Sequence, residues 1–393
     1  MGTAVAQGLS DIEELGEKLF FDQDLSTPPG QSCATCHDPA WGFTGPDHDI
    51  NNAGAVYPGA IHTRFGNRKP PTSAYGGDSP VLDYNVNDDV FIGGMFWDGR
   101  ATGLTLGDPL AEQAMGPFLN PLEQNNPNAR LVCIKVRNSD YAYLFNEVYP
   151  DTPLDCVKDV EGTYERIARS IAAYERSSEV NPFSSKYDAY LKGTIDLTVD
   201  EAKGLELFEG KAKCSACHIS ENGPNGEPPL FTDFTYDNLG IPKNPENPFY
   251  SMPPHFNPDG MDWVDYGLGG FLATTLDKTP DYSGMADDNM GKHKVPTLRN
   301  VDKRPDEDYV KAYGHNGYFK SLKDIVHFYN TRDALNPNSC EDINDPSPGV
   351  NCWPAPEVDA NVNDVELGNL GLTDKEEDQI VAFMMTLSDG YEP

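Results

Sequence analysis

Two short strings place two cysteines and a histidine at one spacing, Cys33-Ala-Thr-Cys36-His37 and Cys214-Ser-Ala-Cys217-His218. Two thiols at this spacing can bond to the two vinyl groups of one haem, and the imidazole that follows then lies beneath the iron. With 8 Cys and 8 His in 393 residues, one such string is expected by chance roughly 0.003 times. Zinc sites and thioredoxin-type pairs occur in other sequence contexts. The sequence therefore predicts two covalently bound haem c groups, with His37 and His218 as the proximal iron ligands.

The segments before these two strings resemble each other. Capping boxes at residues 10–13 and 198–201 each predict the start of a helix ahead of a haem motif. Segments 16–20 and 204–208 align without gaps inside those helices. The chain therefore contains an internal duplication, in which each unit begins with a helix and continues into a haem attachment motif.

Helical patterns also cover residues 164–178 and 184–191, and a capping box at residues 373–376 starts a last helix. Segments 43–96 and 219–312 are rich in Gly, Pro, Asn and Asp, which predicts long loops. Loops of this length in a compact domain usually serve a function or surround a cofactor. The expected fold class is therefore mainly α.

We expect two related cytochrome c-like haem domains joined where the helical pattern ends, at Gly193 and Thr194. The N-terminal haem c domain spans residues 1–193, and the C-terminal one spans residues 194–393. Both domains would carry long irregular loops.

The remaining cysteines form two pairs that are close in sequence, Cys133 with Cys156 and Cys340 with Cys352. An even remainder indicates disulfides and an oxidising compartment, whereas buried free thiols are the alternative. Covalent haem attachment also takes place outside the cytoplasm in most bacteria. We therefore expect a periplasmic or cell-surface protein. The first residues lack the charged and apolar regions of a signal peptide, which we interpret as the start of a mature form.

The chain has 29 Lys and Arg against 63 Asp and Glu, for a formal net charge of −34. A nucleic-acid partner would require a basic surface, so this class is excluded. The charge favours a partner whose docking face is neutral or basic. No apolar stretch approaches the ~18 residues of a transmembrane segment.

Further strings between and after the haem motifs resemble the bacterial di-haem cytochrome c peroxidase superfamily, over nearly the whole chain. These strings are Phe96-Trp-Asp-Gly-Arg100, Glu112-Gln-Ala-Met-Gly-Pro117, Asn120-Pro-Leu-Glu123, Val295-Pro-Thr-Leu-Arg-Asn-Val301 and Tyr313-Gly-His-Asn-Gly317. The resemblance implies a haem peroxidase-type oxidoreductase that depends on hydrogen peroxide. It also implies that the N-terminal domain is the peroxidatic one, whereas the C-terminal domain transfers electrons or oxidising equivalents.

The family's functional residues can be assigned position by position. The resemblance implies that the haem on His37 is the peroxide site, with Glu123 as its distal acid–base and Gln113 as a polar neighbour. Pro117 would shape the same pocket, and Trp97 would relay electrons between the haems. Heterolytic cleavage of peroxide moves a proton between its two oxygens, a task suited to a carboxylate within hydrogen-bond reach. The structural alternatives are an ordinary loop carboxylate at Glu123 and a packed core aromatic at Trp97.

One position departs from the electron-accepting peroxidases of the family, in which the second haem has a Met ligand. Tyr329 stands at that position, fourteen residues after His315. A capping box at residues 321–324 and the apolar spacing after it place Tyr329 on the buried face of a helix, where a hydrogen-bonded core tyrosine is the alternative. A phenolate stabilises ferric and higher states, whereas a thioether raises the potential.

Tyr329 therefore makes the chain resemble most closely the MauG/MbnH-type branch, which has a Tyr-ligated second haem. In that branch hydrogen peroxide forms a high-valent di-haem state that oxidises side chains of a protein partner. The resemblance implies the same reaction here, with a Trp of a protein partner as the target. It also implies that His37, His218 and Tyr329 are the iron ligands.

Two other functions stay open. The first is a di-haem cytochrome c peroxidase that reduces hydrogen peroxide with electrons from a small cytochrome or cupredoxin, with Met285 or Met290 as the second ligand. The second is a di-haem electron carrier in which both irons are six-coordinate.

Other family positions also differ. Lys69 replaces an Asn that ligates an inter-haem calcium ion; an ammonium cannot coordinate a cation, so this calcium is in doubt and Lys69 could supply the charge. His62 is a candidate distal ligand of the first haem, but the spacing around it favours an iron with no protein ligand on that side.

Ala212 replaces a Trp at which oxidising equivalents leave the family's enzyme, so Trp263 or Trp353 could serve instead. We interpret the remaining histidines of the loops as ordinary loop residues, namely His48, His255 and His293.

Overall fold

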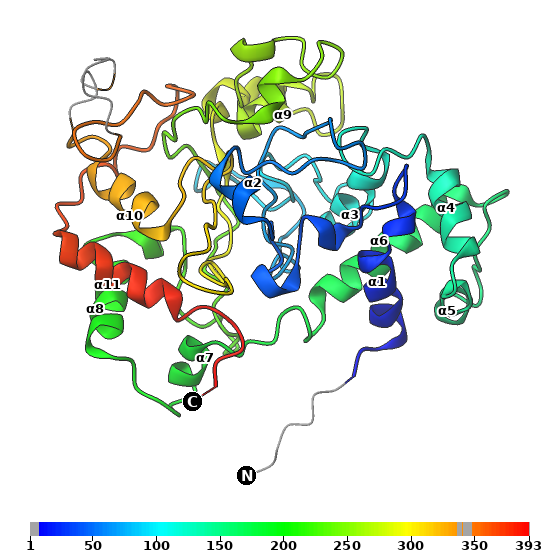
Figure 1. Ribbon diagram of the computed structural model, residues 1–393, viewed down its shortest axis with the longest axis horizontal. Helices are drawn as coiled ribbons and strands as arrows, with labels where there is room; N and C mark the ends of the chain where they lie inside the picture. Colours follow the sequence, from blue (N-terminus) through cyan, green and yellow to red (C-terminus); the bar gives the residue numbers. More distant parts are fainter. Residues whose placement is uncertain (1–7, 336–339, 341–347, 393) are drawn as a thin grey trace.

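The computed structural model describes residues 8–335, 340 and 348–392. Residues 1–7, where the interpretation of the chain start falls, lie outside the described residues. The described part is mainly α-helical with little sheet, as the sequence predicts (Figure 1). Its α-helices are α1 (Asp11–Phe21), α2 (His48–Asn52), α3 (Pro109–Leu119), α4 (Ala129–Asn138), α5 (Ala142–Val148), α6 (Val160–Arg176), α7 (Lys186–Leu191), α8 (Val199–Glu209), α9 (Gly267–Ala273), α10 (Leu322–Thr331) and α11 (Asp374–Met385).

The strands are short and pair as two antiparallel ribbons. Strand β1 (Asp83–Asn85) pairs with β2 (Val90–Ile92), and β3 (Tyr236–Asp237) pairs with β4 (His293–Lys294). Most of segments 43–96 and 219–312 is irregular, as predicted. In the described residues, no helix combines the length and apolar character needed to cross a membrane.

The helix starts follow the predicted capping boxes. Ser10, Thr198 and Thr373 occupy the N-cap positions of α1, α8 and α11, and each is followed by a glutamate at the third helical position that completes a capping box. Ser321 caps α10 by accepting a hydrogen bond from the Asp324 amide at 3.1 Å. These caps fix where each helix begins.

Two helix pairs cross in the same way, one in each half of the chain. Helix α1 packs on α6 and helix α8 packs on α11, and Figure 1 shows the pairs on opposite sides of the molecule. At each crossing a glycine faces a backbone carbonyl: Gly16 meets Ser170, and Gly204 meets Gln379. A Cβ at either glycine would overlap that carbonyl, so only glycine permits the close approach. The two glycines occupy equivalent places in the aligned segments 16–20 and 204–208.

Two large hydrophobic clusters fill the interior. The first includes residues of α1, α3, α4, α5 and α6, with Phe20 and Phe145 fully buried. The second includes residues of α8, α10 and α11, with Phe208 and Phe383 in contact at 5.1 Å between ring centroids. Helix α7 precedes the expected domain boundary but packs in the second cluster through Tyr187. The boundary between residues 193 and 194 stays a prediction.

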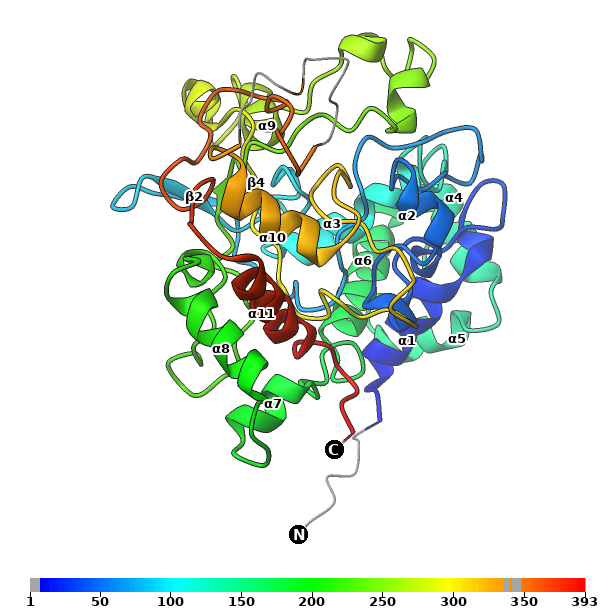
Figure 2. The same ribbon diagram turned by 60° about the vertical axis from the view of Figure 1, so that its left-hand side comes forward.

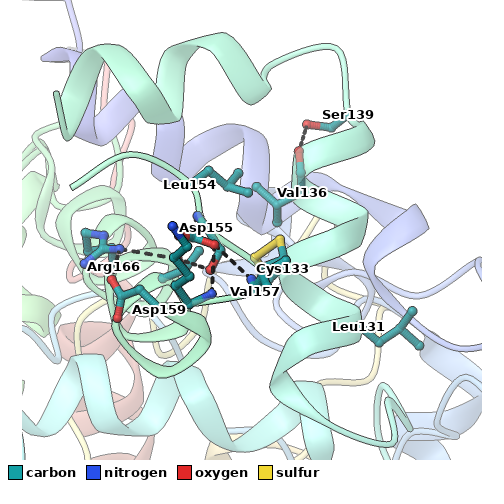
Figure 3. The surroundings of a disulfide bond; sticks show 12 residues. Leu131, Cys133, Val136, Ser139, Leu154, Asp155, Val157, Asp159 and Arg166 are labelled. Atoms are coloured by element: carbon teal, nitrogen blue, oxygen red, sulfur yellow. Dashed lines mark hydrogen bonds and ion pairs between the residues drawn. A yellow bond between two sulfur atoms is a disulfide. The ribbon is translucent and has the colours of Figure 1, made fainter. Parts of the chain in front are cut away.

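Both predicted cysteine pairs are bonded. Cys133 and Cys156 join α4 to the segment before α6, as Figure 3 shows. Beside this disulfide, the Val157 amide donates to the Asp155 carboxylate at 2.9 Å. Cys340 is bonded to Cys352.

Candidate active site

Each haem attachment motif begins as a short 3₁₀ turn, at Cys33–Thr35 and Cys214–Ala216. The histidine after each turn is hydrogen-bonded through Nδ1 to a backbone carbonyl: His37 to Phe43 at 3.1 Å, and His218 to Phe231 at 2.8 Å. Such a bond fixes the ring and leaves Nε2 available as a ligand atom. Burial lowers the pKa of His37 to about 4 and also lowers the pKa of His218, so both imidazoles are neutral.

The four cysteines of the motifs are free of disulfides and half-buried. Burial raises the pKa of the Cys36 thiol to about 12, which keeps the thiol protonated. Amide groups face the first pair, since Gln31 Nε2 lies 3.9 Å from Cys36 Sγ and Gln124 Nε2 lies 4.0 Å from Cys33 Sγ.

A cavity of about 210 Å³ lies beside the second motif. Its wall contains Cys214, Cys217 and His218, together with apolar side chains of α8, α10 and α11. A ring nitrogen held ready for a ligand, two unpaired thiols and a largely apolar hollow fit a covalently attached haem, so the residues of this chain fit the predicted group.

Tyr329 of α10 lines the same cavity as His218. Its hydroxyl has no hydrogen bond to any part of the chain that the structure describes. Burial, followed by the nearby Cys214, raises the pKa of Tyr329 well above its ordinary value. A buried phenolate at this position needs a cation beside it, which the iron of a bound haem would provide. A tyrosine hydroxyl on the cavity wall with no hydrogen bond to the described residues is available as such a ligand.

The methionines considered as alternative ligands are elsewhere. Met285 and Met290 pack in a third hydrophobic cluster, around Leu82 and Phe91, and neither lines the cavity. Met384 of α11 does line it. Met384 was not predicted at this site, because it lies in a helix far from the family's ligand position.

Glu123 is half-buried in the turn after α3, where its carboxylate accepts a hydrogen bond from Asn120 Nδ2 at 2.9 Å. Burial raises the pKa of Glu123, partly opposed by the charge of Arg100. Glu123 also lies close enough to Cys36 to raise the pKa of that thiol, so the structure brings it to the first haem motif.

Gln113 and Pro117 belong to α3, and both are partly exposed. The Gln113 side chain has no hydrogen bond to the described residues. Their roles in the peroxide pocket stay predictions.

Trp97 lines the cavity, and hydrogen bonds hold both its side chain and its backbone. Its indole Nε1 donates to the Lys69 carbonyl at 2.9 Å, and its own carbonyl accepts from the Lys294 amide at 2.9 Å. The indole also packs edge-on against the His315 ring, with 6.5 Å between centroids. Trp97 is therefore fixed between segments of the two halves of the chain, as a relay would require.

His293 is not an ordinary loop histidine. It belongs to β4, is buried, and stacks on His315 with ring centroids 3.6 Å apart and an angle of 10°. Asp265 approaches His293 Nε2 at 3.4 Å and is itself paired with Arg68 at 2.6 Å. Imidazole ligates through an in-plane lone pair, and two parallel stacked rings do not direct their lone pairs at one ion. This cluster is therefore not arranged as a metal site.

His48 is the first residue of α2 and not a loop residue, which corrects the prediction for it. Its Nδ1 accepts a hydrogen bond from the Val310 amide at 3.0 Å. His255 and His62 are exposed, and ligation of the first haem by His62 stays untested.

The two tryptophans considered as exits differ in their surroundings. Trp353 is buried, donates from Nε1 to Thr331 Oγ1 at 3.0 Å, and packs against Phe328, the neighbour of Tyr329 in sequence. Trp263 packs against Phe249, with centroids 5.0 Å apart.

Comparison with known proteins gives a consistent result. Residues 10–196 match the di-haem cytochrome c peroxidase family. The chain is 36% identical over 387 residues to the methylamine utilization protein MauG of Paracoccus denitrificans, which covers 97% of this chain and 90% of that protein. It is 33% identical over 314 residues to the cytochrome c551 peroxidase of Pseudomonas aeruginosa, covering 80% and 70% of the two chains.

Among solved structures, the di-haem peroxidase BthA of Burkholderia thailandensis is similar with a TM-score of 0.76 and 30% identity, covering 98% of this chain and 88% of that chain. A variant of BthA in which a tyrosine is replaced by methionine is also similar, with a TM-score of 0.74 and 28% identity. The duplicated haem motifs and these similarities lead to one conclusion. The chain belongs to the di-haem cytochrome c peroxidase and MauG family of hydrogen peroxide-dependent oxidoreductases.

Proposed function

We propose that this protein uses hydrogen peroxide to oxidise a side chain of a protein partner, a Trp, in the manner that the resemblance to the MauG-type branch implies. The observation that carries the proposal is Tyr329, which lines the same cavity as His218 and whose hydroxyl has no hydrogen bond to the described residues. When bound, the two haems supply the redox chemistry: they take oxidising equivalents from peroxide and pass them on. A phenolate ligand favours holding such equivalents, whereas a thioether favours storing an electron.

The protein contributes proton transfer at the first haem motif. Glu123 is within reach of that motif, and burial raises its pKa, so the carboxyl holds a proton more readily than an exposed one does. In the proposal it takes a proton from one peroxide oxygen and returns it to the other. The O–O bond would then break with two electrons that the bound haems would supply, and the protonated oxygen would leave as water. Asn120, which donates to Glu123 at 2.9 Å, holds the carboxylate in place.

The protein also contributes the path between the haems and the partner. Trp97 is buried and fixed by hydrogen bonds at its indole and its backbone, so its ring has a single orientation for electron transfer. Trp353 supports an exit on the side of the second haem, because it packs on Phe328 beside Tyr329.

We assign the peroxidatic role to residues 1–193 and the transfer role to residues 194–393. The two disulfides and covalent haem attachment support a periplasmic location. The proposal does not include calcium, because Lys69 occupies the position of the family's Asn ligand and an ammonium cannot coordinate a cation.

A cytochrome c peroxidase that detoxifies peroxide is the second candidate function. Relatives named as cytochrome c peroxidases support it, as does Met384, a thioether on the cavity wall. In that case a soluble electron-donor protein replaces the Trp-bearing partner.

The experiment compares the holoprotein with its Tyr329→Phe and Tyr329→Met variants, with Tyr318→Phe as the control. The proposal predicts that wild type oxidises a Trp-bearing partner, detected by mass spectrometry, and reduces peroxide slowly with a reduced small cytochrome. The Tyr329 variants lose partner oxidation, and the control retains it. Fast cytochrome-dependent turnover that survives Tyr329→Phe would establish the second candidate instead.

A further inference from the structure

Three lysines line the cavity beside the second haem motif: Lys311, which is buried, and Lys69 and Lys294, which are half-buried. Among residues 8–335, 340 and 348–392, no carboxylate forms an ion pair with any of the three. Lys69 comes from the first half of the chain, and the other two come from the second half. This concentration of positive charge is unexpected in a chain with 63 acidic residues.

The ammonium groups of Lys69 and Lys294 are only weakly bound by the protein, whereas that of Lys311 is fully hydrogen-bonded. Lys69 Nζ lies 3.3 Å from Thr44 Oγ1 and 3.1 Å from the Pro70 carbonyl. Lys294 Nζ has no hydrogen bond to the described residues and lies 4.5 Å from the centre of the Phe234 ring. Lys311 Nζ donates to three backbone carbonyls, which bind it without neutralising its charge.

Buried charges of one sign are costly unless an opposite charge faces them. Burial lowers the pKa of Lys69 to about 8 and that of Lys294 to about 7, the latter despite the attraction of Asp233. The cavity wall also carries four acids, and each has another partner. Asp265 is paired with Arg68 at 2.6 Å, Asp237 and Glu366 accept hydrogen bonds from Asn363 at 2.6 and 2.7 Å, and Glu357 lies 3.9 Å from His315 Nε2. Since none of them forms an ion pair with a lysine in the described residues, Lys69 and Lys294 remain available to an anion.

Lys69 and Lys294 are placed on either side of Trp97. The Lys69 carbonyl accepts the indole hydrogen bond, and the Lys294 amide donates to the Trp97 carbonyl. Lys69 is also close enough to His37 to influence its pKa, whereas Asp233 links Lys294 electrostatically to His218. Each lysine thus lies toward a different haem motif.

We propose that Lys69 and Lys294 bind the carboxylate groups of the two haems, one lysine for each, with Lys311 as a fixed positive charge behind them. The inference rests on the attachment of two haems, not on the identity of the oxidised partner. The lysines then hold the two haem edges toward Trp97 and bring the two halves of the chain together.

The test measures haem midpoint potentials by spectroelectrochemical titration of the holoprotein. The variants Lys69→Met and Lys294→Met keep roughly the length of the side chain without its charge. The variants Lys69→Arg and Lys294→Arg keep the charge. Lys203→Met is the control, because Lys203 pairs with Glu206 at the surface. Ferric haem carries one more positive charge than ferrous haem, so loss of a nearby ammonium favours the ferric form.

We expect each Met variant to shift a haem potential downward, with wild-type potentials in the control and a return toward them in the Arg variants. Unchanged potentials in the Met variants, or an equal shift in Lys203→Met, would overturn the proposal. Haem content per chain is measured in parallel. Loss of haem in the Met variants but not in the Arg variants supports the proposal, and equal loss in the Met and Arg variants contradicts it.

A second arm separates haem carboxylates from a free anion. Wild-type potentials measured with and without inorganic phosphate should agree, because the binding groups belong to the attached haem. A potential that follows the phosphate concentration would show an exchangeable anion and overturn the assignment. None of these readouts depends on whether a Trp is oxidised, so the proposed function can fail separately.

Discussion

Glu123 is the carboxyl on which the proposed proton transfer depends. Burial raises its pKa, and the hydrogen bond from Asn120, which opposes that shift, holds the carboxylate in position. We expect Glu123→Gln to lower the rate of peroxide reaction by about 10²–10⁴-fold, since the amide does not transfer the proton. Stopped-flow mixing with peroxide measures this rate. Glu112→Gln is the control, because the Glu112 carboxylate accepts hydrogen bonds from backbone amides of the loop before α3. A wild-type rate in Glu123→Gln would contradict the role.

Glu175 of α6 is a buried carboxyl close enough to Cys33 to raise the pKa of that thiol, and its own titration should affect the stability of the fold. Burial raises its pKa to about 8, against an ordinary value of about 4.3. The folded state therefore binds this proton more tightly than the unfolded state, so its contribution to stability is greatest below about pH 4.3 and is lost as pH rises to about 8.

The Glu175→Gln variant removes that titration. It should be more stable than wild type at pH 8 by about 1–3 kcal/mol, with little difference near pH 5, because a neutral amide avoids the buried charge. Thermal unfolding of the holoprotein across this pH range measures the difference. A variant that is less stable than wild type at pH 8 would show that the carboxylate is favourable there.

At the scale of elements, the two glycine crossings test whether helix packing supports the haem motifs. Gly204→Ala places a methyl group against the Gln379 carbonyl and should destabilise the protein by about 1–3 kcal/mol. Gly284→Ala, at a glycine with no atom within 4 Å of the added carbon, is the matched control. Denaturant unfolding compares the two, and equal stabilities would mean that the α8–α11 contact adapts freely.

The helices and their caps could be predicted because their signals are local. Capping boxes and apolar spacing lie within a few residues, so α1, α8, α10 and α11 were predicted at their observed starts. Figure 2 shows α10 and α11 beside each other, although more than forty residues separate them in the chain. The haem motifs and both cysteine pairs were likewise predictable from spacing.

The wall of the cavity could not be predicted, because long loops bring it together. Lys294 and Met384 come from distant segments, and each is an unremarkable residue in its own sequence context. Lys69 stood out only through the family resemblance, as the replacement of an Asn. His293 was interpreted as a loop residue, since nothing local shows that it stacks on His315. Such groupings depend on the path of irregular backbone, for which periodicity gives no signal.

For the whole molecule, a net charge of −34 implies long-range attraction to a basic partner surface. The kcat/KM for the protein partner should fall as ionic strength rises from about 0.01 to 0.15 M, because the Debye length shortens from about 30 to 8 Å. The rate with peroxide alone, a neutral molecule, should not change. A partner reaction that is insensitive to salt would contradict electrostatic docking.

Ligation of the second haem by Tyr329 is the central claim, and electron paramagnetic resonance of the diferric holoprotein tests it most directly. The spectrum of the second haem should change in Tyr329→Phe while that of the first haem, on His37, stays the same. Tyr318→Phe should leave both unchanged. An identical second-haem spectrum in wild type and Tyr329→Phe would show that another atom, such as the Met384 sulfur, binds the iron and would contradict the account.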